Sequence, residues 1–166
     1  MKVLIIIPAY NEEESIEKVI NNLKQNYSQY DYVIINDGSH DHTSEICHKN
    51  KYKIIDLPVN LGLTGAFQTG LKYAYKKGYD YAIQFDADGQ HLPEYIPAMV
   101  DKIEEGYDMV IGSRFVEKPK PRSLRMLGSR VISTAIKITT GVHIADPTSG
   151  MRLFNKTLIR EFAENI

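Results

Sequence analysis

Short continuous apolar runs alternate along this chain with segments in which apolar residues recur every three or four positions. A short aliphatic or β-branched run bounded by turn residues is typical of a strand buried on both faces, and apolar residues at i, i+3, i+4 and i+7 are typical of an amphipathic helix. We therefore predict strands at 3–7, 32–35, 52–57, 81–85, 109–111 and 151–154. We predict helices at 13–23, 43–49, 64–77, 93–105, 124–140 and 158–162.

Repeated strand and helix units predict an α/β fold. Right-handed βαβ units give a mostly parallel central sheet with helices on both faces, which is a three-layer α/β/α arrangement. The length of 166 residues, with 43% hydrophobic and 25% charged residues, fits one globular domain. Ligands of such sheets bind beyond the carboxyl ends of the strands.

Polar residues follow directly after most of the predicted strands, so we expect them to gather at one edge of the sheet. These residues are Tyr10, Glu12, Asp37, Asp41, Asp86, Asp88, Gln90, Ser113 and Arg114. Carboxylates that converge in this way repel one another unless cations or hydrogen-bond donors offset their charge. A metal-bound ligand that contains phosphate would explain the convergence.

The strongest single feature is the apolar run 81–85, which ends in Asp86 and Asp88. Carboxylate oxygens beside a flexible turn at Gly89 suit a hard divalent ion such as Mg²⁺ or Mn²⁺. The alternative is that one Asp caps the helix that begins near Pro93 while the other faces solvent. The expected convergence of carboxylates favours the metal site.

Charged residues are distributed unevenly along the chain, although the net charge is only −1. Residues 1–113 hold 10 Lys and Arg against 17 Asp and Glu, whereas residues 114–130 carry a net charge of +5. The basic segment fits either a solvated loop or a surface that meets substrate phosphates or lipid. The acidic remainder argues against nucleic-acid binding.

Other signatures exclude several classes of protein. The first strand is not followed by a G-x-G-x-x-G fingerprint, and neither a phosphate loop with G-K-[ST] nor a G-x-S-x-G elbow occurs. The single Cys47 excludes an internal disulfide, fits a reducing cytosol, and is more typical of a core position than of a nucleophile. The apolar N-terminal run is too short for a signal peptide, and no later run could span a bilayer.

Six motifs in order carry a resemblance to a known family. The chain resembles the family 2 inverting glycosyltransferases of the A-type fold, and most closely the branch that includes dolichol-phosphate mannose synthase and bacterial polyprenyl-phosphate glycosyltransferases. The motifs are Ile7-Pro8-Ala9-Tyr10-Asn11-Glu12, Asp37-Gly38-Ser39 with Asp41, Asn60-Leu61-Gly62 with Gly65 and Gly70, Asp86-Ala87-Asp88-Gly89-Gln90-His91, Gly112-Ser113-Arg114, and Asp146-Pro147-Thr148-Ser149-Gly150-Met151-Arg152.

The resemblance implies a nucleotide-diphosphate sugar as donor and Mg²⁺ or Mn²⁺ as cofactor. It implies that the nucleotide base lies near Pro8, Tyr10, Glu12 and Asp37, and that the metal is held by Asp86, Asp88 and Gln90. It also implies that Arg114 contacts phosphate, with assistance from Arg125 or Arg130. Asp88, Asp146 and Arg114 are the expected catalytic residues.

The acceptor implied by the resemblance is a polyprenyl phosphate, which is already an anion and needs no general base. Transfer to a saccharide hydroxyl would need one, and Asp146 is the candidate; its alternative role is that of a turn residue before Pro147. A sugar-1-phosphate nucleotidyltransferase is a rival, but its Gly- and Arg-rich loop is absent after the first strand. A sugar-nucleotide binding module without turnover is another alternative.

The resemblance covers essentially the whole chain as one catalytic domain. It implies a nucleotide-binding half at 1–115 and the start of an acceptor-side half at 116–166. Members of this branch generally continue beyond the last motif, so we expect this chain to be a truncated domain. We expect the full-length protein to act at the cytoplasmic face of a membrane.

Overall fold

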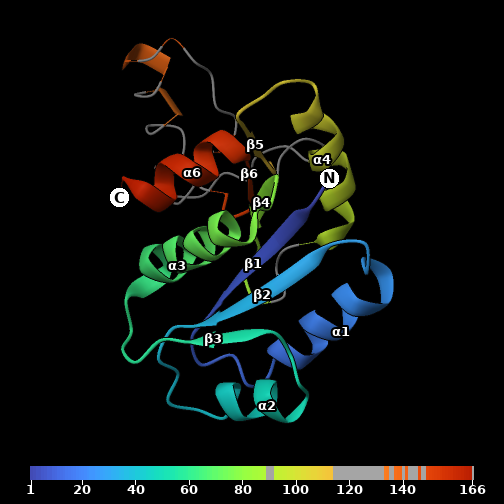
Figure 1. Ribbon diagram of the computed structural model, residues 1–166, viewed down its shortest axis with the longest axis vertical. Helices are drawn as coiled ribbons and strands as arrows, with labels where there is room; N and C mark the ends of the chain where they lie inside the picture. Colours follow the sequence, from blue (N-terminus) through green and yellow to red (C-terminus); the bar gives the residue numbers. More distant parts are fainter. Residues whose placement is uncertain are drawn as a thin grey trace.

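The computed structural model is built around one sheet, and it describes residues 1–88, 92–113, 133–134, 137–139, 141, 146 and 149–165. Its strands are β1 (Val3–Ala9), β2 (Asp31–Asn36), β3 (Ile54–Asp56), β4 (Tyr81–Gln84), β5 (Met109–Ile111) and β6 (Arg152–Asn155). Its helices are α1 (Ile16–Asn26), α2 (Thr43–Lys49), α3 (Gly62–Lys77), α4 (Ile96–Glu104) and α6 (Lys156–Glu164), with a 3₁₀ turn η1 (Pro93–Tyr95) before α4 (Figure 1).

The sheet is mostly parallel, as the sequence predicted. Its strand order is β3-β2-β1-β4-β6-β5, and β1, β2, β3 and β4 all run in the same direction. The sequence did not predict that β6 lies between β4 and β5 and pairs antiparallel with both. This reversal places the segment before β6 at the edge where the parallel strands end.

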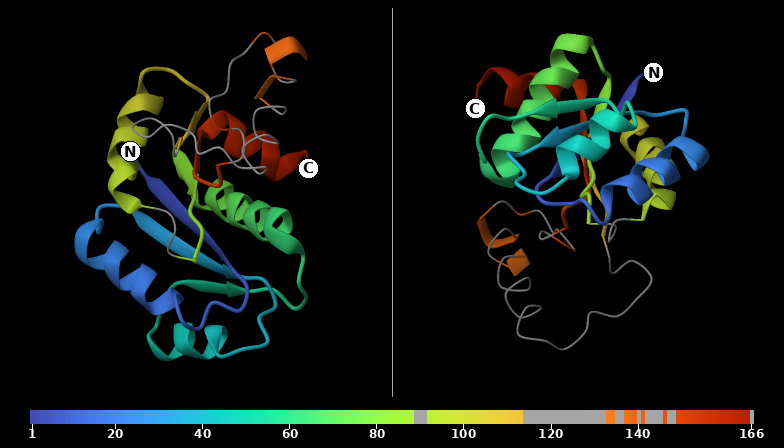
Figure 2. Two further views of the ribbon diagram at one scale, coloured as in Figure 1. Left: turned by 180° about the vertical axis from the view of Figure 1, so that it is seen from behind. Right: turned by 90° about the horizontal axis from the view of Figure 1, so that it is seen from below.

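Helices cover both faces of the sheet, which confirms the three-layer prediction (Figure 2). Strand β1 is buried throughout and alternates between two cores. Val3, Ile5 and Ile7 pack with α1, α2 and α4 on one face, whereas Leu4 and Ile6 pack with α3 and α6 on the other. A strand covered on both faces needs apolar side chains at successive positions, which explains its continuous apolar run.

Helix boundaries differ from the predictions by a few residues. Helix α1 begins at Ile16 rather than residue 13, after a turn at residues 13–15 in which the N–H groups of Ser15 and Ile16 both donate to the carbonyl of Glu12. Helix α3 ends as predicted at Gly78, whose φ of +70° lies in the left-handed region that glycine adopts without strain. Most of the predicted helix 124–140 lies outside the described residues, although 133–134 and 137–139 are helical. Within the described ranges, the helices are too short or too polar to cross a bilayer.

We predict that Gly70→Ala destabilises the fold, although alanine is the better helix former by about 1 kcal/mol. A Cβ atom at Gly70 of α3 would overlap the side chain of Ile6, which is fully buried on β1. Overpacking of this kind costs about 1 to 3 kcal/mol, so the free energy of unfolding in urea should fall. Lys72→Ala, at an exposed position of the same helix, is the control and should change stability little. Equal or higher stability of the Gly70→Ala variant would contradict the close packing of α3 on β1.

Candidate active site

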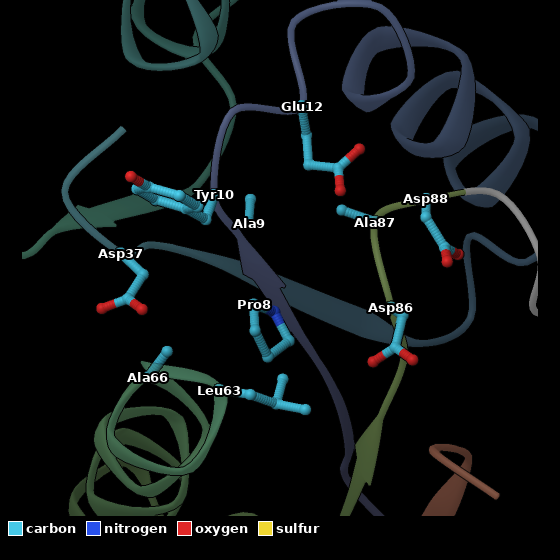
Figure 3. Close-up of a pocket in the computed structure, with 10 residues that line it drawn as sticks. All are labelled: Pro8, Ala9, Tyr10, Glu12, Asp37, Leu63, Ala66, Asp86, Ala87 and Asp88. Carbon is cyan, nitrogen blue, oxygen red and sulfur yellow. The ribbon is translucent and has the colours of Figure 1, made fainter. Parts of the chain in front are cut away.

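A pocket of about 230 Å³ lies at the carboxyl ends of β1 and β4 (Figure 3). The chain moves outward from β1 to β2 and β3, and then returns to the opposite side of β1 as β4. The crevice between β1 and β4 is therefore the topological switch point, where ligands of open α/β sheets bind. Ten residues line the pocket, namely Pro8, Ala9, Tyr10, Glu12, Asp37, Leu63, Ala66, Asp86, Ala87 and Asp88.

Asp86 and Asp88 form one wall of this pocket (Figure 3). Strand β4 ends at Gln84, and in the segment after it the buried Phe85 and Ala87 alternate with the more exposed Asp86 and Asp88. Gln84 is itself buried, and its Nε2 lies 3.4 Å from Oδ1 of Asp86. The period of two that the sequence suggested thus brings both carboxylates to one site.

Asp37 lies on the opposite wall, directly after β2 (Figure 3). Its side chain is almost completely buried, with 3% of the residue exposed. Oδ1 accepts a hydrogen bond of 2.7 Å from the backbone N–H of Leu61, which fixes the orientation of the carboxylate. Within the part of the chain that the structure describes, Oδ2 has no hydrogen-bond partner. A buried carboxylate oxygen of this kind is suited to accept from a ligand N–H group.

Apolar groups connect the two acidic walls. Pro8 and Ala9 come from the end of β1, and Leu63 and Ala66 come from the first two turns of α3. Tyr10 stands at the rim with 44% of its surface exposed, and its ring makes an edge contact with His40 at 6.3 Å between centroids. The pocket therefore offers apolar side chains between hydrogen-bonding ends.

Glu12 contributes a fourth acidic side chain, at the top of the view in Figure 3. The hydroxyl of Ser15 donates to its Oε2, and its backbone carbonyl accepts from the first turn of α1. The backbone N–H of Glu12 donates to Oγ1 of Thr43 at 2.8 Å. Contacts with two different helices thus position this residue.

The donor set suits a divalent ion shared with a ligand. In the described ranges, no group of three or more His, Cys, Asp or Glu side chains is arranged to hold a metal on its own. Mg²⁺ is commonly bound by one or two carboxylates together with substrate phosphates and water. Asp86 and Asp88 provide such a pair of oxygen ligands, so the residues present fit Mg²⁺ or Mn²⁺ with a diphosphate.

The structure brings six of the predicted site residues into one pocket: Pro8, Tyr10, Glu12, Asp37, Asp86 and Asp88. Asp41, which we expected at the same edge, does not line it, because its carboxylate accepts hydrogen bonds from Glu13 and Thr43. Gln90, Arg114, Arg125 and Arg130 lie outside the described residues.

Asp146 precedes β6 and is buried, with 1% of its surface exposed. Its carbonyl accepts from the N–H of Ser149 at 3.2 Å. The Ser149 hydroxyl in turn donates to the carbonyl of Gly112, which follows β5. Residues 147 and 148 lie outside the described residues, so both roles of Asp146, as a turn residue and as a general base, stay predictions.

Comparison with known proteins agrees with this geometry. The profile of Glycosyl transferase family 2 matches residues 4–162. The chain belongs to this family. A UDP-N-acetylglucosamine–dolichyl-phosphate N-acetylglucosaminyltransferase of Methanococcus voltae is 35% identical over 99% of this chain and 73% of its own length. A polyprenol monophosphomannose synthase of Mycolicibacterium smegmatis is 27% identical over 96% of the chain and 64% of its own length.

Solved structures confirm the A-type fold of this family 2 chain. Glucosyl-3-phosphoglycerate synthase from Mycobacterium tuberculosis, in complex with Mn²⁺, UDP-glucose and phosphoglyceric acid, superposes with a TM-score of 0.74. The sequence identity is 20%, and the match covers 95% of this chain and 57% of that one. At this identity the likeness establishes the fold alone.

Sequence reasoning missed the wall formed by α3. Leu63 and Ala66 line the pocket, yet nothing in a helical Leu or Ala signals a contact with ligand. The missing information was the bond from Leu61 to Asp37, which draws the start of α3 toward the end of β2. Asn60-Leu61-Gly62 belongs to one of the quoted motifs, so its match to the family was the available signal.

Cys47 lies apart from the pocket, in the core under α2, and we predict that it is inert. Burial raises the pKa of its thiol to about 11, so little reactive thiolate forms at pH 8. Titration with a disulfide reagent should therefore detect no thiol in the native protein and one after denaturation. Rapid reaction of the native protein would contradict the buried position.

Proposed function

We propose that this chain is the donor-binding part of an enzyme that transfers a sugar from a nucleotide-diphosphate donor to a polyprenyl phosphate. The observation that carries the proposal is the arrangement of one pocket at the switch point of the sheet. Asp37 lies at one end, and Asp86 and Asp88 lie at the other, with apolar side chains between them. A nucleoside diphosphate has a comparable order of groups: a hydrogen-bonding base with apolar faces, a ribose and a pair of phosphates.

The base end of the donor would lie against Asp37. Oδ2 of its carboxylate would accept a hydrogen bond from the ring N–H beside a carbonyl that uracil and guanine share. Tyr10, exposed at the rim, would stack against the base, and Pro8 and Glu12 would border the nucleoside. The bond from Leu61 holds Oδ1, so the direction of Oδ2 is set before the ligand arrives.

The diphosphate would lie at Asp86 and Asp88, joined to them by Mg²⁺ or Mn²⁺, with Gln90 as a further ligand. When bound, such an ion would offset the negative charge that develops on the departing diphosphate. Arg114, assisted by Arg125 or Arg130, would add cationic contacts to phosphate. Without cations the acidic pocket would repel a diphosphate, which explains why donor binding would require the metal.

The acceptor is proposed from the relatives, whose printed names include dolichyl-phosphate, polyprenol and undecaprenyl-phosphate transferases. An oxygen of the acceptor phosphate would attack the anomeric carbon while the bond from that carbon to the diphosphate breaks, with inversion. A phosphate is already ionised at neutral pH and needs no base. Asp146 would serve as general base only if the acceptor were a saccharide hydroxyl.

The two halves of the chain would divide this work. Residues 1–115 would hold the nucleotide and metal, and residues 116–166 would begin the acceptor side. The chain spans 64% to 73% of the two relatives compared above, so the activity of the whole protein is part of the proposal. A polyprenyl acceptor places that protein at a membrane surface, and we propose the cytoplasmic face.

We predict that Asp88→Asn weakens Mn²⁺-dependent binding of UDP or GDP at least about tenfold, because the site loses one charged ligand. Calorimetry with and without Mn²⁺ measures this change. Transfer of labelled sugar from UDP- or GDP-sugars to a polyprenyl phosphate should fall about 100-fold. Asp101→Asn, at an exposed position of α4, is the matched control. Binding of UDP or GDP that does not depend on Mn²⁺ would contradict the metal assignment. Binding of nucleotide by the wild type without any sugar transfer would favour a binding module.

We also predict selectivity for bases with a ring N–H beside a carbonyl. UDP and GDP should bind about 100-fold more tightly than CDP and ADP, whose corresponding ring nitrogen is an acceptor and cannot donate to the buried Asp37 oxygen. In Asp37→Asn, the Leu61 N–H should retain Oδ1 as its acceptor and so direct the amide NH₂ into the pocket. That variant should lose affinity for UDP and gain affinity for CDP in calorimetric titrations. An unchanged ratio of the two affinities would show that Asp37 does not read the base.

A further inference from the structure

Three consecutive backbone N–H groups after β1 donate to three side chains of the connection between β2 and α2. Asn11 N–H donates to Ser39 Oγ at 3.0 Å, Glu12 N–H to Thr43 Oγ1 at 2.8 Å, and Glu13 N–H to Asp41 Oδ2 at 3.1 Å. The three acceptors stand at alternate positions of the sequence. The two segments are about 30 residues apart in the chain, so these bonds are tertiary contacts.

Thr43 is the centre of this arrangement. It is fully buried at the start of α2, and its hydroxyl both accepts from Glu12 and donates to Oδ1 of Asp41 at 2.6 Å. The backbone N–H of Thr43 also donates to Oδ1 of Asp41, at 3.0 Å. Burial alone would raise the pKa of Asp41, but the hydrogen bonds from Thr43 and Glu13 outweigh it and hold that pKa below its ordinary value. Three hydrogen bonds from within the protein therefore engage this carboxylate.

Asn11 makes the reciprocal contact. Its φ is +55°, a left-handed conformation that asparagine tolerates better than most residues. In this conformation Oδ1 of Asn11 accepts the backbone N–H of His40 at 2.8 Å. His40 is also the residue whose ring contacts Tyr10. The turn between Tyr10 and Glu12 is thus fixed from both sides.

We propose that Ser39, Asp41 and Thr43 are positioning residues that hold the segment after β1 so that its side chains face the nucleotide. The segment carries two pocket residues, Tyr10 and Glu12, on either side of the left-handed Asn11. The three positioning side chains do not line the pocket themselves. This inference rests on the proposed function, since it assigns these side chains a part in donor binding.

The test compares Thr43→Val, which keeps the shape of the side chain and removes its hydroxyl, with Thr43→Ser, which restores the hydroxyl. Thr69→Val is the matched control, because the Thr69 hydroxyl donates only within α3, to the carbonyl of Gly65. Amide hydrogen exchange of the ligand-free protein measures how firmly the segment after β1 is held. Calorimetric titration with UDP and GDP in the presence of Mn²⁺ measures the effect on nucleotide affinity.

We expect the Glu12 amide of Thr43→Val to exchange at least about tenfold faster, while the amides of Ile5 and Ile6 in β1 stay protected. Nucleotide affinity should fall about tenfold, because a buried donor loses its partner. Thr43→Ser should recover most of both effects, and Thr69→Val should show neither.

An unchanged Glu12 amide in Thr43→Val would overturn the proposal. Faster exchange with unchanged nucleotide affinity would also overturn it, because the bonds would then be structural only. Failure of the wild type to bind any nucleoside diphosphate would instead contradict the proposed function, and with it the role of Ser39, Asp41 and Thr43 in donor binding. The exchange data would still decide separately whether Thr43 fixes the segment.

Discussion

Parallel pairing of β1 with strands on both sides is the constraint on which the site depends. Because β1 pairs with β2 on one side and with β4 on the other, its carboxyl end is flanked by the ends of both strands. The chain leaves β1 toward β2 and later returns to the other side as β4, so a crevice is left open at the carboxyl ends of β1 and β4. Asp37 enters it from β2 and Asp86 from β4, which turns a packing gap into a pocket with two acidic walls.

The electrostatics of this edge divide the carboxylates into two groups. Asp41 and one oxygen of Asp37 accept hydrogen bonds from backbone N–H groups of neighbouring segments, so they hold the walls in place. Asp86 and Asp88 face the pocket beside one another, where a cation would reduce their repulsion. Clusters of acidic side chains therefore serve both as structural acceptors and as ligand contacts in this family 2 domain.

Small side chains set how closely the layers approach the site. Gly70 allows α3 to lie directly on Ile6 of β1. A Cβ atom added at Gly112 would lie 3.3 Å from side-chain atoms of Met99 and Met151. The first contact fixes α3, which carries Leu63 and Ala66 into the pocket. The packing of the core thereby determines the width of the crevice as well as the stability of the fold.

The sequence by itself determined the α/β class, the parallel strands and the gathering of polar residues at their ends, because hydrophobic period and strand-to-helix order are local properties. It also placed the side chains of Asp86 and Asp88 on the same side, since residues two apart in an extended segment point the same way whatever packs against them. Only the tertiary structure decided that Asp41 is a structural acceptor, that Leu63 forms a wall and that β6 lies between β4 and β5. Those outcomes depend on contacts between segments far apart in the chain, which no local pattern encodes.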